Sequence, residues 1–366
     1  MKIAVMIARY SISGVPLAQI RLARALADGG HQVDLVVGHV PSGLTVPDVP
    51  GVRRIELGRD KVRDLLRPIA GYLRREKPDV AFTAEDHLNA LVLAAAIITR
   101  SKTKISGSSR VTPFDTYSST PFSKRWFLKH FMRLVAWRAD ALTCVSEDMV
   151  AQYRTVFKNS RHVSVYNIVD DARARALVNQ PVDHPWFAQG GGPLAVAAGS
   201  LQPWKGFADA IEAIAVLRDR GVDVRLVILG EGPLRGELEA LIAARDLADR
   251  VLLHGHVDNP LAYFAKADIF VLSSLVEGLP NVLVEAMMCG CTPVSTDCPT
   301  GPREVLQDGR FGYLVPMRDP AGLADGIEKA IAAPTDPALL AEAVKPFGQE
   351  IVLGRHFDLL GLPRNG

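Results

Sequence analysis

Two glutamates with seven residues between them, Glu277 and Glu285, are the residues whose spacing first suggests chemistry. Glu277 follows the apolar run ADIFVLSSL, and Glu285 lies in the helical pattern NVLVEAMMCG. Pro280 stands where that helix would begin, so the first amide hydrogens of the helix would point at the loop that contains Glu277. A helix start favours a phosphate, and carboxylates accept hydrogen bonds from sugar hydroxyls. The pattern therefore fits a nucleotide diphosphate sugar, and equally well a surface glutamate followed by a glutamate that stabilises the helix dipole.

Lys205 is the cation that the sequence places closest to such a diphosphate. It follows the strand pattern LAVAAGS and precedes the helical pattern GFADAIEAIAVLRDRG. From that position its ammonium group can donate to negative charge that develops on a leaving phosphate. Taken without its neighbours, a solvated loop lysine is the better interpretation.

Short apolar runs alternate with helical patterns along the whole chain, as in KIAVMIA, VPLAQIRLARALADGG and QVDLVVG. This alternation predicts an α/β protein in which helices cover both faces of parallel sheets. It breaks at residues 178–193, VNQPVDHPWFAQGGGP, where the prolines and glycines are typical of a linker. We therefore expect two doubly wound, Rossmann-like domains, 1–177 and 194–345, that face a central cleft. Ligands would bind at the carboxyl ends of the strands.

The charge of the chain is divided unevenly. Residues 1–180 contain 27 Lys and Arg against 16 Asp and Glu, whereas residues 181–366 contain 15 against 24. This asymmetry predicts an anionic partner for the first half, and the absence of a nucleic-acid motif excludes nucleic acid. The segment SKRWFLKHFMRLVAWR combines basic and apolar faces. It fits a membrane-surface helix, although a core helix with a solvated basic face is favoured.

Other features bound the class of protein. The longest apolar stretch, LNALVLAAAIIT, is too short to span a bilayer, and the opening apolar run is too short for a signal-peptide core. We expect a cytoplasmic protein. The four cysteines, Cys144, Cys289, Cys291 and Cys298, lack a usual zinc spacing and have no histidine close to them in sequence. We expect reduced, buried thiols and no metal site.

Several longer segments together resemble one enzyme family. EGLPNVLVEAMMCGCTPVSTDCPTGPREVL resembles the E-x7-E region of the family 4 retaining glycosyltransferases, which have the GT-B fold. AAGSLQPWKGFADAIEAI is similar to the G-R-L-x-x-x-K-G segment of that family, and LVILGEGPLRGELEALIAARDLADRVLLHGHVDN to its next block. ADALTCVSEDM and VYNIVD are similar to its markers late in the first domain. The resemblance implies an acceptor-side domain at 1–177, a nucleotide-sugar domain at 194–345, and a C-terminal helix in 346–366 that packs back on the first domain.

The resemblance also implies roles for individual residues. Glu277 matches the glutamate that contacts the donor sugar and helps the transfer, Glu285 the ligand of the ribose, and Lys205 the lysine that neutralises the diphosphate. Backbone amides after Glu277 would complete a phosphate cradle, and the loop after HGH would hold the base. The other residues expected at the donor are Gly14, Gly199, Ser200, Gly230, His256, Val257, Gly278, Leu279, Asn281 and Val282.

The chain departs from the family pattern at two loops. Ser200 stands where the family usually has an arginine, and Arg110, from the facing domain, is a candidate replacement with a structural role as an equal alternative. Gly14 is followed by Val15 in place of a second glycine, which makes the loop shape there uncertain.

The first-domain catalytic histidine of the family has no clear match. His87 in AEDHLNAL is the nearest candidate, and it shares its loop with Glu85, Asp86 and Asn89. His254 and His256 are interpreted as loop or core residues more readily than as catalysts.

The resemblance implies a retaining, metal-independent glycosyltransferase. It would move a sugar from a nucleotide sugar, with UDP as the expected nucleotide, to a glycan or lipid-linked acceptor in cell-surface polysaccharide or glycoconjugate synthesis. No cofactor is expected, because Lys205 and the helix start would hold the diphosphate and the chain contains no Asp-x-Asp pair. We also expect peripheral contact with the inner face of an anionic plasma membrane through the basic domain.

Four alternatives stay open at this point. A sugar-nucleotide epimerase shares the architecture, and a transferase that uses GDP-mannose shares the motifs. The glycines of VRLVILGEGPLRGEL suggest a dinucleotide-dependent oxidoreductase, although Pro233 and the missing acid after the next strand argue against it. A non-catalytic sensor of nucleotide sugars is the fourth.

Overall fold

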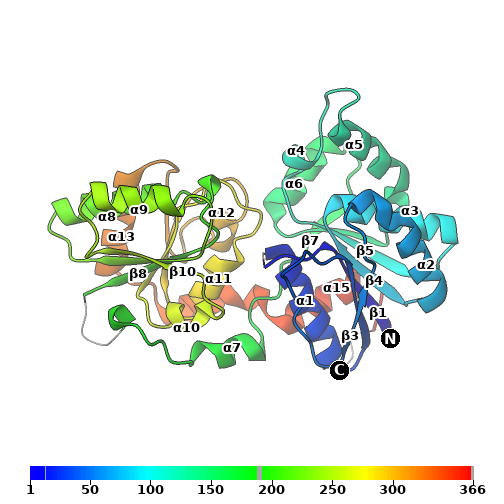
Figure 1. Ribbon diagram of the computed structural model, residues 1–366, viewed down its shortest axis with the longest axis horizontal. Coiled ribbons are helices and arrows are strands. Elements are labelled where there is room, and N and C mark those ends of the chain that lie inside the picture. The colour runs from blue at the N-terminus through cyan, green and yellow to red at the C-terminus, as the bar shows by residue number, and fades with distance from the viewer. Residues whose placement is uncertain (13, 188–191, 364–366) are drawn as a thin grey trace. The chain divides into compact units, whose positions relative to one another are not determined.

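The chain divides into two compact units in the computed structural model, which describes residues 1–12, 14–187 and 192–363 (Figure 1). The first unit is Met1–Ile168 with Gln349–Gly366, and the second is Val169–Gly348. The division falls earlier than residue 177, because the segment after Ile168 packs on the second unit. There the side-chain amide of Asn259 donates to the carbonyl of Leu177 at 2.9 Å and to Gln180 Oε1 at 2.9 Å. Residues 188–191 of the expected linker lie outside the described residues.

Seven parallel strands form the sheet of the first unit, in the order β3-β2-β1-β4-β5-β6-β7. Strands β1 and β2 are buried along almost their whole length, because helices cover both faces of the sheet. This confirms the expected arrangement for the first domain. The strands are β1 (Lys2–Arg9), β2 (Gln32–His39), β3 (Val52–Glu56), β4 (Val80–Ala84), β5 (Lys104–Ser109), β6 (Ala141–Cys144) and β7 (His162–Ser164).

Helices α1 and α15 cover one face of this sheet, and α2 and α3 cover the other (Figure 1). Val352 and Phe357 of helix α15 and Leu360, directly after its end, are buried in the same cluster as the α1 side chains. The C-terminal segment thus belongs to the core of the first unit. The helices and 3-10 turns are α1 (Gly14–Asp28), η1 (Val62–Leu65), α2 (Leu66–Glu76), α3 (Asp86–Thr99), α4 (Pro113–Thr116), α5 (Lys124–Val135), η2 (Ala136–Arg138), α6 (Glu147–Val156) and α15 (Gln349–Leu359).

Six parallel strands form the sheet of the second unit, in the order β10-β9-β8-β11-β12-β13. The strands are β8 (Leu194–Ala198), β9 (Arg225–Leu229), β10 (Val251–Gly255), β11 (Ile269–Leu272), β12 (Thr292–Thr296) and β13 (Tyr313–Val315). The helices and 3-10 turns are α7 (Ala172–Val178), η3 (Pro185–Phe187), η4 (Pro203–Lys205), α8 (Phe207–Asp219), α9 (Arg235–Ala244), α10 (Pro260–Phe264), α11 (Asn281–Met288), α12 (Pro302–Val305), α13 (Pro320–Ala332), α14 (Pro337–Val344) and η5 (Lys345–Phe347). Both faces of this sheet are again covered.

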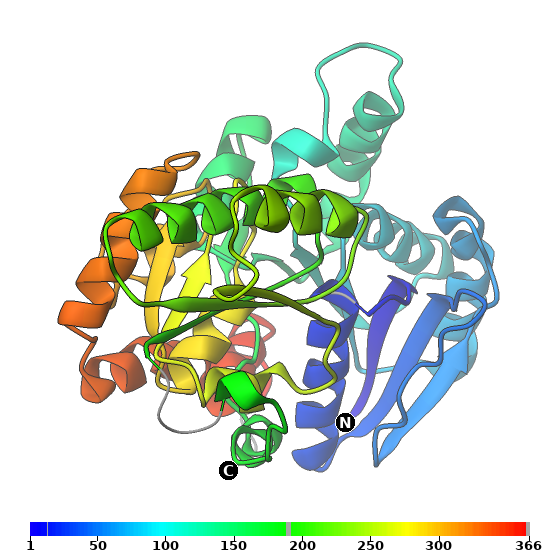
Figure 2. The ribbon, with the colours of Figure 1, turned by 60° about the vertical axis from the view of Figure 1, so that its left-hand side comes forward.

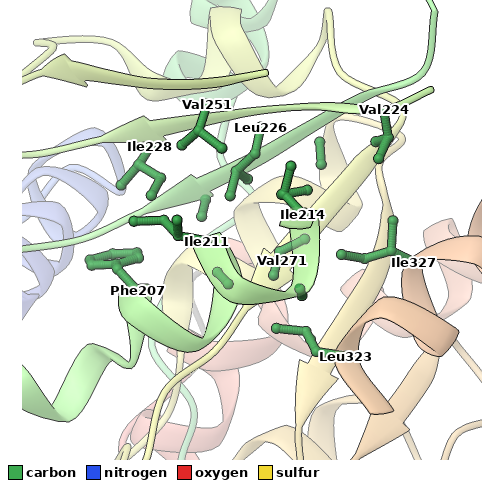
Figure 3. Packing of buried hydrophobic residues seen from close by; sticks show 14 of the residues in the cluster. Phe207, Ile211, Ile214, Val224, Leu226, Ile228, Val251, Val271, Leu323 and Ile327 are labelled. Atoms are coloured by element: carbon green, nitrogen blue, oxygen red, sulfur yellow. The ribbon is translucent and has the colours of Figure 1, made fainter. Parts of the chain in front are cut away.

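Helices α8, α9 and α13 pack on one face of the second sheet, and Figure 2 shows α8 and α9 running along that face. Alternate strand residues point into this layer, so Leu226 and Ile228 of β9 meet Ile211 of α8 (Figure 3). The period of two along the strand and of 3.6 along the helix brings these side chains together. Because the cluster is fully buried, it holds the loops at the strand ends on a rigid base.

The strand order reverses between β1 and β4 in the first unit and between β8 and β11 in the second. At such a point the loops after the two strands diverge to opposite faces of the sheet, and ligands of doubly wound folds bind there. Gly14 and His87 lie in the first turns of the helices that follow β1 and β4, and the segments directly after β8 and β11 carry Lys205 and Glu277. Each unit thus places expected site residues at its own switch point.

Among the described helices, not one combines the length and the apolar character that crossing a bilayer requires.

Candidate active site

Lys205 and Glu277 form an ion pair at the switch point of the second unit. The ammonium Nζ of Lys205 lies 2.6 Å from Oε1 of Glu277, and the two side chains are 18% and 11% exposed. The hydroxyl of Ser274 donates to the same Oε1 at 2.7 Å. Within the described part of the chain, Oε2 of Glu277 accepts no hydrogen bond. A carboxylate held by one oxygen can accept a ligand hydroxyl with the other.

The turn that carries Lys205 is fixed to the end of β11. Its carbonyl accepts a hydrogen bond from the hydroxyl of Ser273 at 2.9 Å, and the carbonyl of Trp204 accepts one from the amide of Leu275 at 2.8 Å. The next residue, Gly206, has φ +63°, and a Cβ there would lie 2.0 Å from the carbonyl oxygen of Ser273. Only glycine fits this approach, so Gly206 sets the position of the lysine.

The loop that carries Glu277 packs against a strained segment after β12. The hydroxyl of Thr300 donates to the carbonyl oxygen of Glu277, and Thr300 itself has φ +64°. Gly301 has φ +94°, and a Cβ there would lie 2.6 Å from Cδ of Pro280. Unfavourable backbone conformations persist where the surroundings determine them, and they cluster at functional sites. The strain here fixes the loop between Glu277 and helix α11.

Helix α11 begins directly after that loop, with Pro280 as its N-cap residue. In the described residues, the amide hydrogens of Gly278 and Leu279 find no acceptor. Glu285 lies one turn into the helix and is half-buried. Lys205, Glu277 and the start of α11 therefore lie at one carboxyl edge of the sheet, an arrangement that can hold an anion beside hydroxyl groups.

Glycines bring the loops after β8, β9 and β10 into contact. Gly230 has φ +146°, and a Cβ there would lie 1.9 Å from the carbonyl oxygen of Gly199. The amide of Gly230 donates to the carbonyl of Gly255 at 2.8 Å. A Cβ on Gly199 would lie 3.5 Å from Cε of Lys205, so this loop borders the lysine. Ser200, the next residue, is exposed.

The two histidines after β10 differ in their surroundings. His256 is exposed, with Nε2 3.6 Å from Oδ1 of Asp258, and the neighbouring Val257 is partly buried. His254 packs among the rings of His184 and Tyr263, and burial lowers its pKa. The packing of His254 indicates a structural role, whereas His256 is accessible to a ligand.

The candidate residues of the first unit divide into buried and accessible groups. Asp86 is buried and accepts from the hydroxyl of Ser109 at 2.7 Å and from that of Tyr153, and burial raises its pKa. Asn89 is also buried, where it accepts from Thr83 at 2.5 Å and donates to the carbonyl of residue 108 at 3.0 Å. Both side chains fix the start of α3 to the sheet.

Glu85 and His87 flank that buried carboxylate and stay accessible. Glu85 has φ +76°, and His87 is 43% exposed with Nε2 3.4 Å from Oε2 of Glu85. The hydrogen bond that His87 donates to the carboxylate of Glu85 raises the pKa of His87. The structure thus gives His87 a carboxylate partner that favours its cationic form.

Gly14 and Arg110 also lie in the first unit. Gly14 begins α1, and a Cβ there would meet nothing within 4 Å. Arg110 donates to the side chain of Asn167, and burial lowers its pKa to about 10. Its partner lies within its own unit, and its expected role at the diphosphate stays a prediction.

Sequence reasoning missed several residues that position the site. Ser273, Ser274, Gly206 and Thr300 stand beside the predicted residues in the segments IFVLSSLVEG, WKG and CPTGP. Polar or glycine residues directly after buried strands are the signal that could have found them. Tyr153 gave no such signal, because it lies far from Asp86 in sequence.

The cysteines form no disulfide, and Cys298 lies after β12 near the ion pair. Burial, with a smaller contribution from Glu277, raises the pKa of Cys298 to about 12. Over residues 1–12, 14–187 and 192–363, no group of His, Cys, Asp and Glu side chains is placed to hold a metal ion.

Comparison with known proteins assigns this architecture to a family. A family model described as "Glycosyl transferase 4-like domain" matches residues 13–167, and one described as "Glycosyl transferases group 1" matches residues 192–333. Together the two models account for most of the chain.

Individual relatives agree with these models. An N-acetylgalactosaminyltransferase of Campylobacter jejuni that acts on a diphospho-undecaprenol acceptor is 41% identical over 133 residues, which are 36% of each chain. The lipopolysaccharide core biosynthesis glycosyltransferase LpsE of Rhizobium meliloti is 25% identical over 352 residues, 93% of this chain and 94% of that protein. The Anabaena protein HepE, solved with UDP and glucose, superposes with a TM-score of 0.77 and 18% identity over 99% of both chains. The two matched domains, the two parallel sheets and these relatives place the chain among the family 4 glycosyltransferases of GT-B fold.

Proposed function

We propose that the protein transfers a sugar, with retention of configuration, from a nucleotide diphosphate sugar to a glycan or lipid-linked acceptor. The observation that carries this proposal is the Lys205–Glu277 pair beside the start of α11. It combines a cation, a carboxylate and helix amides at a single strand edge. Diphosphate and sugar are the two groups that such a set recognises.

We expect the donor to rearrange the ion pair when it binds, because both partners would turn to the ligand. Lys205 would exchange part of its contact with Glu277 for the diphosphate and stabilise the charge on the leaving phosphate. Glu277 would then accept hydrogen bonds from the donor sugar, and Glu285 would bind the ribose. Ser274 and Thr300 keep the carboxylate and its backbone in place during this exchange.

UDP is the nucleotide we propose for the donor, and the acceptor belongs to the cell-surface glycan or glycolipid class. Support comes from the UDP and glucose bound by HepE, from the role of LpsE in lipopolysaccharide core biosynthesis and from the diphospho-undecaprenol acceptor of the Campylobacter enzyme. We further propose that transfer needs no metal ion, since Lys205 and the helix amides supply positive charge. The same activity measured with and without EDTA tests that point, and loss with EDTA would refute it.

Accessible groups of the first unit are proposed to serve the acceptor side. His87, whose pKa is raised by Glu85, is the candidate there, while Arg110 is the candidate for a further phosphate contact. We also propose that the basic first unit contacts an anionic membrane, which would bring the enzyme to a lipid-linked acceptor.

Proton NMR of UDP-sugars incubated with the protein tests the transferase proposal. The acceptors are a polyprenyl-diphosphate-linked oligosaccharide and a free oligosaccharide. We expect release of UDP with an acceptor present, and a product whose new linkage keeps the α configuration of the donor. Glu277→Gln should lose turnover, while Glu237→Gln, an acidic residue on α9, should keep it.

Each alternative has its own outcome in the same experiment. Conversion of the nucleotide sugar to another nucleotide sugar without acceptor would identify an epimerase. Turnover of GDP-mannose in place of UDP-sugars would keep the reaction and change the donor. Binding without any turnover would indicate a sensor, and binding of NADH alone an oxidoreductase.

A further inference from the structure

Helix α5 exposes an apolar stripe that the fold leaves uncovered. Only Met132 and Val135 of this helix are buried, whereas Phe127 is 54% exposed and Leu134 is 70% exposed. Trp137, one turn further in η2, is 67% exposed. Residues seven apart lie on the same helix face, so these side chains form one row. The favoured expectation of a core helix is therefore wrong for this face of α5, which meets solvent.

A second basic amphipathic segment of the same unit behaves as ordinary core structure. Helix α2 also carries arginines, but its apolar residues Ile69, Tyr72 and Leu73 are buried. The two helices have similar sequence patterns, but the apolar face is buried in α2 and largely exposed in α5. The exposed stripe of α5 is thus a property of that helix and needs its own explanation.

A cationic pocket adjoins the stripe. It has a volume of about 780 Å³ and lies between α5 with η2 and the segment that joins α6 to β7. Lys129 and Arg133 of α5 line it from one side, and Lys158 and Arg161 from the other. Its lining includes no Asp or Glu. As far as the structure describes the chain, none of these four cations pairs with a carboxylate.

Aromatic side chains form the walls between the cations. The guanidinium of Arg133 lies 5.7 Å from the ring centroid of Phe157, and Trp137 also lines the pocket. Arg161 donates to the carbonyl of Ala136 at 3.2 Å, which holds its charge at the rim. The pocket is therefore a preorganised site for an anionic group rather than a set of independent surface lysines.

We infer that this pocket binds the phosphate of an anionic phospholipid while the stripe of α5 and η2 enters the membrane interface. Four cations without acidic partners complement a negatively charged lipid surface, and exposed Phe, Leu and Trp side chains favour the boundary between headgroups and acyl chains. In Figures 1 and 2, α5 and the loop before it lie at the margin of the first unit. The inference deepens the proposed function and rests on it for the lipid-linked acceptor.

Co-sedimentation of the full chain with vesicles tests this site. The vesicles contain phosphatidylcholine alone or phosphatidylcholine with phosphatidylglycerol. We expect binding only to the anionic vesicles. The double charge reversal Lys129→Glu with Arg133→Glu should weaken it about tenfold or more. Leu134→Ser with Trp137→Ser should weaken it as well, because apolar insertion is lost.

The matched control is Arg67→Glu with Arg74→Glu. It makes the same change in net charge on α2, where both arginines are exposed. This variant should bind anionic vesicles nearly as the wild type does. Equal loss in the control would show diffuse charge attraction and would overturn the site. Equal binding to both vesicle types, or binding that neither pocket nor stripe variant changes, would also overturn it.

Two further arms separate the remaining explanations. Inorganic phosphate that binds the wild type while anionic vesicles do not would identify an anion site without a membrane role. A dimer in solution that the Leu134→Ser, Trp137→Ser variant dissolves would show that a second copy covers the stripe. The thermal shift caused by UDP, measured on every variant, reports the proposed function separately. A wild-type protein that fails to bind the anionic vesicles but still shows the UDP shift would refute only this inference.

Discussion

Glu277 and Glu285 could be singled out from the sequence because their segment resembles the E-x7-E region of the family. Their neighbours Ser274 and Thr300 could not, since the hydrogen bonds they make to Glu277 depend on how separate loops pack. The same holds for Asp86, whose burial follows from contact with Tyr153. Sequence patterns therefore pointed to the candidate ligand-binding residues more readily than to the residues that position them.

Gly206→Ala tests whether the lysine turn depends on its glycine. We expect a loss of stability on the order of 1–3 kcal/mol from the positive φ, with a further loss because the methyl group would meet the carbonyl of Ser273 at 2.0 Å. The displaced Lys205 should also weaken binding of UDP. Urea unfolding and UDP titration measure both effects.

Gly221→Ala is the matched control for that substitution. Gly221 also has a positive φ, +77°, but a Cβ there would meet nothing within 4 Å. Gly221→Ala should lower the free energy of unfolding by about 1 kcal/mol and leave UDP binding unchanged. Equal effects of the two substitutions on UDP binding would contradict the assigned role of Gly206.

Helix α15 provides the clearest prediction at the scale of an element. His356 of this helix is buried against Phe82, with ring centroids 5.1 Å apart. Burial, with smaller contributions from the charges of Arg110 and Arg355, lowers the pKa of His356 to about 3. The folded protein therefore holds this histidine neutral at pH values where the unfolded chain would protonate it.

The sign of the resulting pH dependence follows directly. The stability that depends on neutral His356 is complete above pH 6.5 and is lost as the pH falls from 6.5 toward 3, by about 1.4 kcal/mol per pH unit. Over this pH range the urea concentration at the unfolding midpoint should decrease as the pH falls. His356→Leu should make that midpoint depend less steeply on pH. His162, whose pKa burial lowers to about 4, keeps its own share in that variant. A slope that His356→Leu leaves unchanged would refute the assignment.

Helix α5 shows where element prediction fails. Its amphipathic pattern predicts a helix correctly, but a pattern alone does not state which face is covered. Exposure of Phe127 and burial of Met132 depend on the neighbours that the fold supplies. The period of the pattern identifies the helix, and tertiary packing decides what the helix can bind.

At the scale of the whole molecule, alternation of strand and helix patterns was enough to predict two doubly wound α/β units. The place where the chain passes from one to the other was less predictable, because residues 169–177, which were expected in the first domain, include most of helix α7 and belong to the second unit. Composition marks where regular structure ends, whereas contacts decide to which unit a segment belongs.

Removal of residues 349–366 tests how the C-terminal segment contributes to the molecule. The deletion takes Val352, Phe357 and Leu360 out of the core of the first unit, each with a burial contribution of about 1.5–3 kcal/mol. We expect a strongly lowered melting temperature. Phe357→Ala alone should cost about 3–5 kcal/mol, whereas Ile351→Ala, on the exposed face of the same helix, should change stability by less than about 0.5 kcal/mol. A deletion that melts like the full chain would contradict this account.

The central claim is that Lys205, Glu277 and the start of α11 form a nucleotide-sugar site, and thermal shift with UDP, GDP, ADP and NAD tests it most directly. We predict that UDP raises the melting temperature of the wild type and of Lys266→Ala, an exposed lysine of the same unit. UDP should not raise the melting temperature of Lys205→Ala or of Glu285→Ala. A preference for GDP would change the donor and keep the site. If no nucleoside diphosphate shifts the melt, or if both site variants respond as the wild type does, the site is assigned wrongly.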